Sequence, residues 1–197
     1  MGDPVRRPGN DLLFSQMAEA NIEQIKSANV TKLLSICPHC VRTLSEDYKE
    51  FGESFRIEHH RELLARMKDK LPQPTGARET TVFHDPFYLG RYEGVFDEPR
   101  EVIARYGEVD PARTRERSFC CGAGGGQMFL GEEKGKRVNV ERATELAATG
   151  AAVVGTACPF CLTMFRDALA TVSQTPPKLL DIAQIAGAQL HEKAPVS

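Results

Sequence analysis

The pattern of apolar and polar positions along the chain predicts strands and helices in regular alternation. Short apolar runs such as VTKLLSI (30–36) and AAVVGTA (151–157) are typical of buried strands, and a segment with helical spacing of its apolar residues follows each. Similar strand-like runs occur in FRIEHH (55–60) and TTVFHDP (80–86), and the tail PKLLDIAQIAGAQL (177–190) combines a short strand and a helix. This alternation predicts an α/β fold of mostly parallel sheets with flanking helices.

Capping residues suggest where two of the helices begin. The first helix is expected from about residue 11, with Asn10 or Asp11 as its cap, and a later one over NVERATELAATG (139–150), with Asn139 as its cap. The Pro- and Gly-rich segment LPQPTGARE (71–79) is typical of a connector. We therefore expect two domains, residues 1–73 and residues 74–197.

The two expected domains share an internal repeat. LLSICPHCVRTLSEDY and VVGTACPFCLTMFRDAL each combine an apolar strand, a Cys-Pro-X-Cys turn and a helix, and their first cysteines, Cys37 and Cys158, lie 121 positions apart. The repeat predicts two related, Rossmann-like half-units in one pseudo-symmetric chain.

Composition and charge narrow the possible functions. The 197 residues, 41% of them hydrophobic, are sufficient for a globular core. The formal net charge of −2 does not indicate the basic surface that binding to nucleic acid requires. The N-terminal segment has no apolar region typical of a signal peptide, and no apolar stretch is long enough to span a bilayer. We therefore expect a cytoplasmic protein, in which cysteine patterns indicate metal or redox chemistry more often than structural disulfides.

The cysteines are the strongest candidates for this chemistry. All six fall in three tight pairs: Cys37 and Cys40, Cys120 and Cys121, and Cys158 and Cys161. A Cys-X-X-Cys turn at the start of a helix lets two sulfurs face one metal, and the positive end of the helix dipole favours the thiolate form. An iron–sulfur cluster, zinc and a redox disulfide can all use such a turn.

The adjacent pair favours a large ligand. Side chains of neighbouring loop residues diverge, so two consecutive cysteines suit a cluster better than a single zinc ion. Four glycines occupy five positions after them, and the N–H groups of Gly122, Gly124 and Gly125 could approach an anionic cluster. A phosphate loop is a poorer match, because GAGGGQ lacks the last glycine of G-x-G-x-x-G and no Walker lysine follows.

One histidine and one aspartate are further candidates. His84 and Asp85 directly follow the strand predicted at 80–83. They could serve as a proton donor or a ligand near the site, or they could organise the loop through hydrogen bonds.

These motifs together resemble the CCG cysteine-rich domain, which occurs in a subunit of heterodisulfide reductase and in related iron–sulfur oxidoreductases. The resemblance rests on HDPFYLGR, SFCCGAGGG, KRVNVERA and TACPFCLTM, and it covers most of residues 80–185. Residues 10–64, with CPHC, resemble the end of a preceding CCG domain whose opening cysteines would lie before Met1. The resemblance thus implies that the chain is the C-terminal part of a longer protein.

The resemblance also implies a set of cluster ligands. Cys120, Cys121, Cys158 and Cys161 match four of the five cysteines that hold a non-cubane cluster in heterodisulfide reductase. The fifth would lie in HDPCxLGR, where this chain has Phe87, with 32 residues between it and Cys120. Since phenylalanine cannot bind iron, the expectation is an ordinary [4Fe–4S] cluster on the four matching cysteines, with Cys37 and Cys40 as an incomplete second pair.

The leading hypothesis is therefore an iron–sulfur oxidoreductase or oxidoreductase subunit. It would pass electrons from a flavoprotein or ferredoxin-like donor to a quinone or disulfide acceptor, with peripheral association to a membrane subunit at the inner membrane. One alternative is a zinc-stabilised structural or assembly domain that has lost the cluster. The other is a metal-free thiol–disulfide oxidoreductase that uses Cys158 and Cys161.

Overall fold

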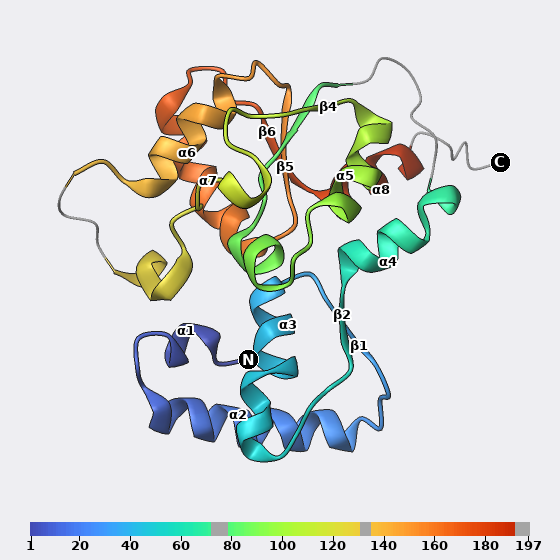
Figure 1. The fold of residues 1–197 in the computed structure, drawn as a ribbon, viewed down its shortest axis with the longest axis vertical. Coiled ribbons are helices and arrows are strands. Elements are labelled where there is room, and N and C mark those ends of the chain that lie inside the picture. Colours follow the sequence, from blue (N-terminus) through green and yellow to red (C-terminus); the bar gives the residue numbers. More distant parts are fainter. Residues whose placement is uncertain (72–78, 131–134, 192–197) are drawn as a thin grey trace.

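The N-terminal part of the chain is a small layer of helices on a two-stranded sheet. The computed structural model describes residues 1–71, 79–130 and 135–191. In the lower half of Figure 1, strands β1 (Leu33–Ser35) and β2 (Ile57–His59) pair in parallel and lie beside helix α3 (Pro38–Ser45). Helix α2 (Asp11–Ser27) runs below them, and helix α1 (Asp3–Arg6) lies on the far side of α3. Helix α4 (His60–Arg66) follows β2 directly and leads towards the upper half.

Helix α2 shows why this part folds as the sequence suggests. The side chain of Asn10 accepts a hydrogen bond from the backbone N–H of Leu13 at 3.1 Å, which confirms the expected cap. Phe14 and Ala18, four positions apart on one face, are buried against Leu44 and Tyr48.

The C-terminal part is built on a four-stranded parallel sheet. The strand order is β4 (Glu108–Val109), β3 (Thr81–Phe83), β5 (Val153–Thr156) and β6 (Lys178–Asp181). Helices α6 (Val138–Ala147) and α7 (Pro159–Val172) cover the face that carries Val82 and Val154. Helices α5 (Asp97–Ile103) and α8 (Ile182–His191) cover the opposite face, so the sheet lies between two helical layers (Figure 1).

The α/β prediction is confirmed, and most deviations from it are local. Strand β4, helix α1 and a π-helix at Tyr88–Tyr92 were not predicted. The prediction of Asn139 as a helix cap is wrong, because the cap is Arg137, two positions earlier, and Asn139 lies in the first turn of α6. The Asn139 side chain instead donates a hydrogen bond to the carbonyl of Met164 at 3.0 Å, and thereby ties α6 to α7.

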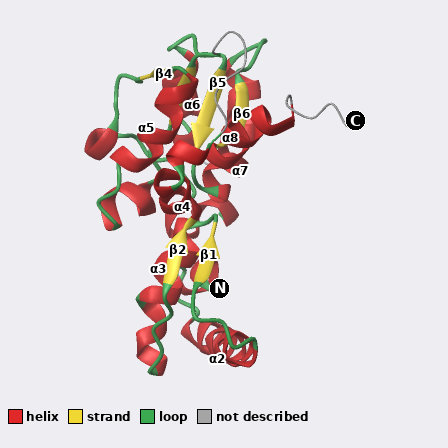
Figure 2. Cartoon of the chain, turned by 90° about the vertical axis from the view of Figure 1, so that its right-hand side faces the viewer, coloured by secondary structure: helices red, strands yellow, loops and turns green. Residues whose placement is uncertain are grey.

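The internal repeat is visible in the order of elements. Strand β1 leads through Cys37 into α3, β2 and α4, just as β5 leads through Cys158 into α7, β6 and α8. The side view in Figure 2 shows the small sheet below the larger one. The two parts also touch, since His60 Nε2 lies 2.8 Å from the Asp181 carboxylate. The predicted boundary at residue 73 falls within 72–78, outside the described residues.

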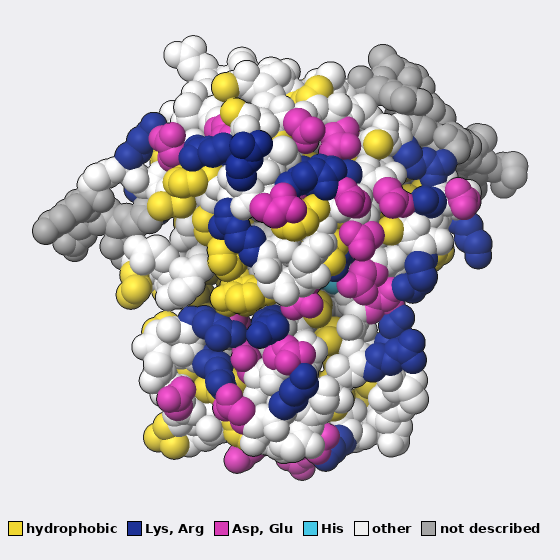
Figure 3. All heavy atoms as spheres, viewed as in Figure 1, with side chains coloured by type: hydrophobic (Ala, Val, Ile, Leu, Met, Phe, Trp, Pro, Cys, Tyr) yellow, Lys and Arg dark blue, Asp and Glu magenta, His cyan; other side chains and the backbone are white. Residues whose placement is uncertain are grey.

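The molecular surface and the helices show two further features. Figure 3 shows Lys and Arg side chains interspersed with Asp and Glu over one face, with apolar side chains visible at the junction of the two parts. Among the described residues, no helix is both long and apolar enough to cross a membrane.

Candidate metal centre

Both Cys-Pro-X-Cys turns place a cysteine at the start of a helix. Cys37 and Cys158 are the capping residues of α3 and α7, each with extended backbone angles, and a proline takes up the first helical position after each. The partial positive charge at a helix N-terminus therefore lies beside both turns, where it stabilises thiolate sulfur.

The glycine loop encloses the sulfur of Cys120. Gly122 has φ +85°, and a Cβ atom there would lie 3.3 Å from the backbone of Asn139, so the tight loop requires glycine. The Gly122 N–H donates to Cys120 Sγ at 3.3 Å, and the N–H of Gly124 also faces this sulfur. Gly125 has φ +64° with open space around its Cα. Two of the three predicted glycines thus face a cysteine.

Four cysteines from two distant motifs converge below this loop. The sulfurs of Cys121 and Cys161 are 3.1 Å apart, Cys120 contacts Cys121, and Cys158 contacts Cys161. Cys121, Cys158 and Cys161 are each 5% exposed or less. The structure therefore brings together the four cysteines that the sequence predicts as ligands.

The first cysteine pair lies at the same place. Cys37 is buried and its side chain contacts Cys158, while Cys40 contacts Cys37. The sequence alone suggests that this pair is part of a separate, incomplete site. In the folded chain the six sulfurs instead form one continuous row that crosses the junction of the two parts, and all six are free thiols.

The thiols in this row have unequal acidities. Hydrogen bonds from Cys120, Cys161 and His84 hold the pKa of Cys121 well below its usual range. Burial raises the pKa of Cys161 well above its usual range, and its neighbours Cys121 and Cys158 raise it further. Burial opposes ionisation of Cys158, but hydrogen bonds from Cys161 and Cys37 lower its pKa to about 5, so negative charge in the row is stabilised on both Cys121 and Cys158.

The two further candidates have different surroundings. His84 is fully buried, and its ring nitrogen lies within 4.8 Å of the sulfurs of both Cys121 and Cys161. Burial lowers the pKa of His84, so its imidazole is neutral at pH 7. Asp85 instead binds Arg100 through two hydrogen bonds of 2.6 and 3.0 Å. His84 belongs to the site, whereas Asp85 organises the neighbouring loop.

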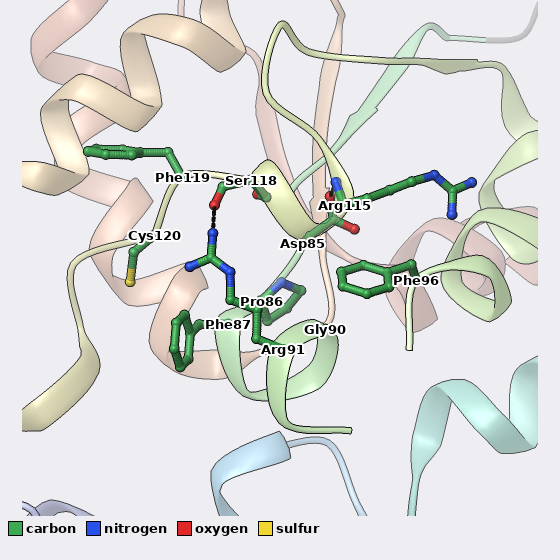
Figure 4. Close-up of a pocket in the computed structure, with 10 residues that line it drawn as sticks. All are labelled: Asp85, Pro86, Phe87, Gly90, Arg91, Phe96, Arg115, Ser118, Phe119 and Cys120. Carbon is green, nitrogen blue, oxygen red and sulfur yellow. Dashed lines mark hydrogen bonds between the residues drawn. The ribbon is translucent and has the colours of Figure 1, made fainter. Parts of the chain in front are cut away.

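Phe87 lies beside the cysteine row, as the comparison with HDPCxLGR leads one to expect. It lines a small pocket together with Cys120, Arg91 and Ser118 (Figure 4). The Arg91 guanidinium lies over the Phe87 ring at 5.0 Å and donates a hydrogen bond to the Ser118 carbonyl at 2.7 Å. The aromatic ring at position 87 thus fills one wall of a small cavity next to Cys120.

Sequence reasoning missed the residues that join the two turns. The ring of His39, from CPHC, stacks on Tyr88 at 3.8 Å and meets the edge of Phe160, from CPFC, at 4.5 Å. His39 Nδ1 lies 2.8 Å from the Asp3 carboxylate, which also accepts a hydrogen bond from the Tyr88 hydroxyl at 3.2 Å. The available signal was the third position of each Cys-Pro-X-Cys turn, because His39 and Phe160 come into edge-on contact.

An α/β chain with a largely buried row of cysteines, two of which cap helices, is typical of cysteine-rich metal or redox domains. The sequence model of the cysteine-rich domain family CCG matches residues 2–45 and 81–166, and the chain belongs to this family.

Several relatives share much of this chain. It is 38% identical to the probable iron-sulfur-binding oxidoreductase FadF of Bacillus subtilis, over 93% of the chain and 27% of that protein. It is 35% identical to the EtfAB:quinone oxidoreductase of Syntrophomonas wolfei, over 93% of the chain and 28% of that protein. A third relative, 34% identical over 87% of the chain and 45% of that protein, is a dihydromethanophenazine:CoB–CoM heterodisulfide reductase subunit from Methanosarcina acetivorans.

The chain therefore spans about a quarter of the length of the first two relatives. Among solved structures, glutamate racemase from Francisella tularensis aligns with 96% of the chain and 65% of its own, at a TM-score of 0.39 and 13% identity. That likeness is too low to carry an argument about fold or function.

Proposed function

We propose that this chain is the iron–sulfur electron-transfer part of an oxidoreductase, with a [4Fe–4S] cluster on Cys120, Cys121, Cys158 and Cys161. The observation that carries the proposal is the convergence of these four cysteines, from motifs about 40 positions apart, into one row beside the N-terminus of α7, in which three of the four are buried. Their donor chemistry fits the group, because iron–sulfur clusters are held by cysteine thiolates. Relatives named as iron–sulfur and quinone or heterodisulfide oxidoreductases support the same function.

The chain's own residues would set the properties of this cluster, which when bound supplies one-electron transfer. Burial of Cys121, Cys158 and Cys161 keeps water away from the sulfurs. The N–H groups of Gly122 and Gly124 face Cys120 and stabilise negative charge there. Burial and hydrogen bonds to sulfur are the means by which proteins adjust cluster potentials.

Cys37 is the candidate to replace one of these four ligands, because a [4Fe–4S] cluster takes one thiolate per iron. Position 87 offers only a phenylalanine ring, but Cys37 reaches the row from the other part of the chain and contacts Cys158. Cys40 touches Cys37 and lies at the end of the row, so we assign it no ligand role. With Cys37 from residues 1–73 and the other cysteines from residues 74–197, both expected domains contribute to one centre.

The electron donor and acceptor are inferred from relatives. One relative is named as an EtfAB:quinone oxidoreductase and another as part of a heterodisulfide reductase. We infer a flavoprotein or ferredoxin-like donor and a quinone or disulfide acceptor. A relative from Chromohalobacter salexigens, 27% identical, is named as a probable membrane-anchored ferredoxin, which supports peripheral association with a membrane subunit at the cytoplasmic side.

A zinc-stabilised domain is the second candidate. His84, Cys121 and Cys161 offer three ligand atoms within 4.8 Å of one another, a donor set that zinc can use. Such a domain would be colourless and would contain no sulfide.

The test compares anaerobically purified wild type with two cysteine variants. Absorption and EPR spectra are recorded before and after reduction, and zinc is measured in the same samples. Cys158→Ser removes a central member of the row and should abolish the cluster signal. The matched control Cys40→Ser, at the end of the row, should retain it. A colourless wild type that contains zinc would contradict the iron–sulfur proposal.

A further inference from the structure

The imidazole of His84 is held in one orientation by a buried arginine. Arg142 is fully buried on α6, and its Nε donates a hydrogen bond to His84 Nδ1 at 3.3 Å. The Phe165 ring meets the His84 ring edge-on at 4.7 Å and closes the other side. A flip of the His84 ring would exchange its two nitrogens and break the hydrogen bond from Arg142.

Arg142 is itself fixed by three partners. Its two terminal nitrogens donate to the carbonyl of Arg113 at 2.8 Å and to the hydroxyl of Ser118 at 3.1 Å. The Glu145 carboxylate lies 2.8 Å away and balances the charge. The guanidinium thus points its Nε–H at His84 as part of a network built around α6.

This contact determines which ring nitrogen of His84 carries the hydrogen. A guanidinium only donates hydrogen bonds and does not lose a proton in proteins, so Nδ1 of His84 must accept with its lone pair. In a neutral imidazole the hydrogen then lies on Nε2. A metal ligand needs the opposite arrangement, with a lone pair on the nitrogen that faces the metal.

The protonated nitrogen is the one left to bond the cysteine row. His84 Nε2 is buried and has no hydrogen-bond partner among the described residues. The sulfurs of Cys121 and Cys161 lie within 4.8 Å of a His84 ring nitrogen, and Nδ1 is already taken by Arg142. A buried donor without a partner, this close to two sulfurs, is placed to bond a thiolate.

We propose that His84, held in the Nε2–H tautomer by Arg142, donates a hydrogen bond to the Cys121 thiolate and is not a metal ligand. Arg142 is a positioning residue for this bond. The inference rests on the proposed function, because it concerns a thiolate that binds the cluster. Charge on the cysteine sulfurs increases when a cluster is reduced, so this bond stabilises the reduced state and raises the midpoint potential.

The expected effect can be measured on the cluster-loaded protein. His84→Phe removes the donor and should shift the ratio of reduced to oxidised cluster at a given potential about tenfold towards oxidised, a fall of about 59 mV for a one-electron couple. His84→Gln keeps an N–H group near the position of Nε2 and should restore most of the shift. Arg142→Gln frees the tautomer and should lower the potential in the same direction.

Pulsed EPR distinguishes a donor from a ligand without relying on variants. In the wild type we expect an exchangeable proton coupling to the reduced cluster that disappears in deuterated water, with no coupling to a directly bound nitrogen. His60→Phe is the matched control, because His60 is also buried but pairs with Asp181 rather than with a cysteine. It should leave the potential and the proton coupling unchanged.

The outcomes separate this inference from the proposed function. An iron–sulfur signal with a strong nitrogen coupling, or with a potential that His84→Phe leaves unchanged, overturns the role of His84 but leaves the cluster in place. A wild-type protein without iron overturns the cluster, and this inference with it. If the His84 variants do not fold, the wild-type spectra and the Arg142→Gln potential still decide the question.

Discussion

The loop that follows β3 should depend for its stability on a buried ion pair between Asp85 and Arg100. Asp85 is 4% exposed and receives two hydrogen bonds from Arg100, at 2.6 and 3.0 Å. It also accepts the backbone N–H of Arg115 at 2.8 Å. Asp85→Asn keeps an acceptor for Arg115 but removes the charge that balances the guanidinium, so it tests the structural role of Asp85 directly.

The size of the effect follows from what remains around Arg100. Removing one partner of a buried ion pair costs about 3–5 kcal/mol, because the other charge stays buried without compensation. Here Glu108 still lies 3.3 Å from Arg100 Nε, so the charge is only partly uncompensated. We therefore expect a loss of about 3 kcal/mol, at the lower end of that range.

Urea unfolding of the cluster-loaded protein, followed by circular dichroism, measures this loss. The control is Glu79→Gln, which breaks the exposed ion pair with Lys178 at 2.7 Å and should cost less than about 1 kcal/mol. A loss below about 1 kcal/mol for Asp85→Asn would refute the reasoning. Loss of the cluster at unchanged stability would refute it differently, since Asp85 would then act in the metal centre.

Three further predictions concern pH, backbone strain and ligation. Burial lowers the pKa of His59 to about 3, so the folded protein keeps this imidazole neutral and loses no stability to its protonation above the ordinary pKa of 6.5. Below pH 6.5 the free energy of unfolding should fall by about 1.4 kcal/mol per pH unit, and His59→Gln should flatten this slope in urea titrations between pH 5 and 7. Gly126→Ala should cost about 1–3 kcal/mol in thermal unfolding, because φ is +80° and the new Cβ would lie 2.8 Å from Pro8; Gly124→Ala, which has open space, should cost less. Cys37→Ser should alter the EPR line shape, because Cys37 contacts the cluster ligand Cys158, and an unchanged spectrum would remove Cys37 from the centre.

Local sequence patterns were sufficient to predict most of the architecture. Strands β1 and β5 were short apolar runs followed by turn residues, and Asn10 lay at a helix start with typical capping chemistry. The shortest elements were missed, because the two residues of β4 carry no periodicity. Asn139 was mistaken for a cap since it lies near the start of α6, whereas its partner is Met164, 25 positions further on.

The candidate site depended on contacts that no local pattern reveals. Spacing groups the cysteines into pairs, but it does not show that Cys37 meets Cys158 across the junction. That contact follows from packing of His39 against Tyr88 and Phe160, residues far apart in the chain.

Local sequence patterns also could not distinguish the polar residues next to the cysteines. His84 and Asp85 are neighbours in sequence and looked equivalent. Arg142 and Arg100, from different helices, give them different surroundings.

Native mass spectrometry of the anaerobically purified chain tests the central claim most directly. The account predicts an added mass equal to about four iron and four sulfide per chain, which Cys158→Ser abolishes. A chain that carries only zinc, or no added mass at all, would contradict the claim that these cysteines hold an iron–sulfur cluster.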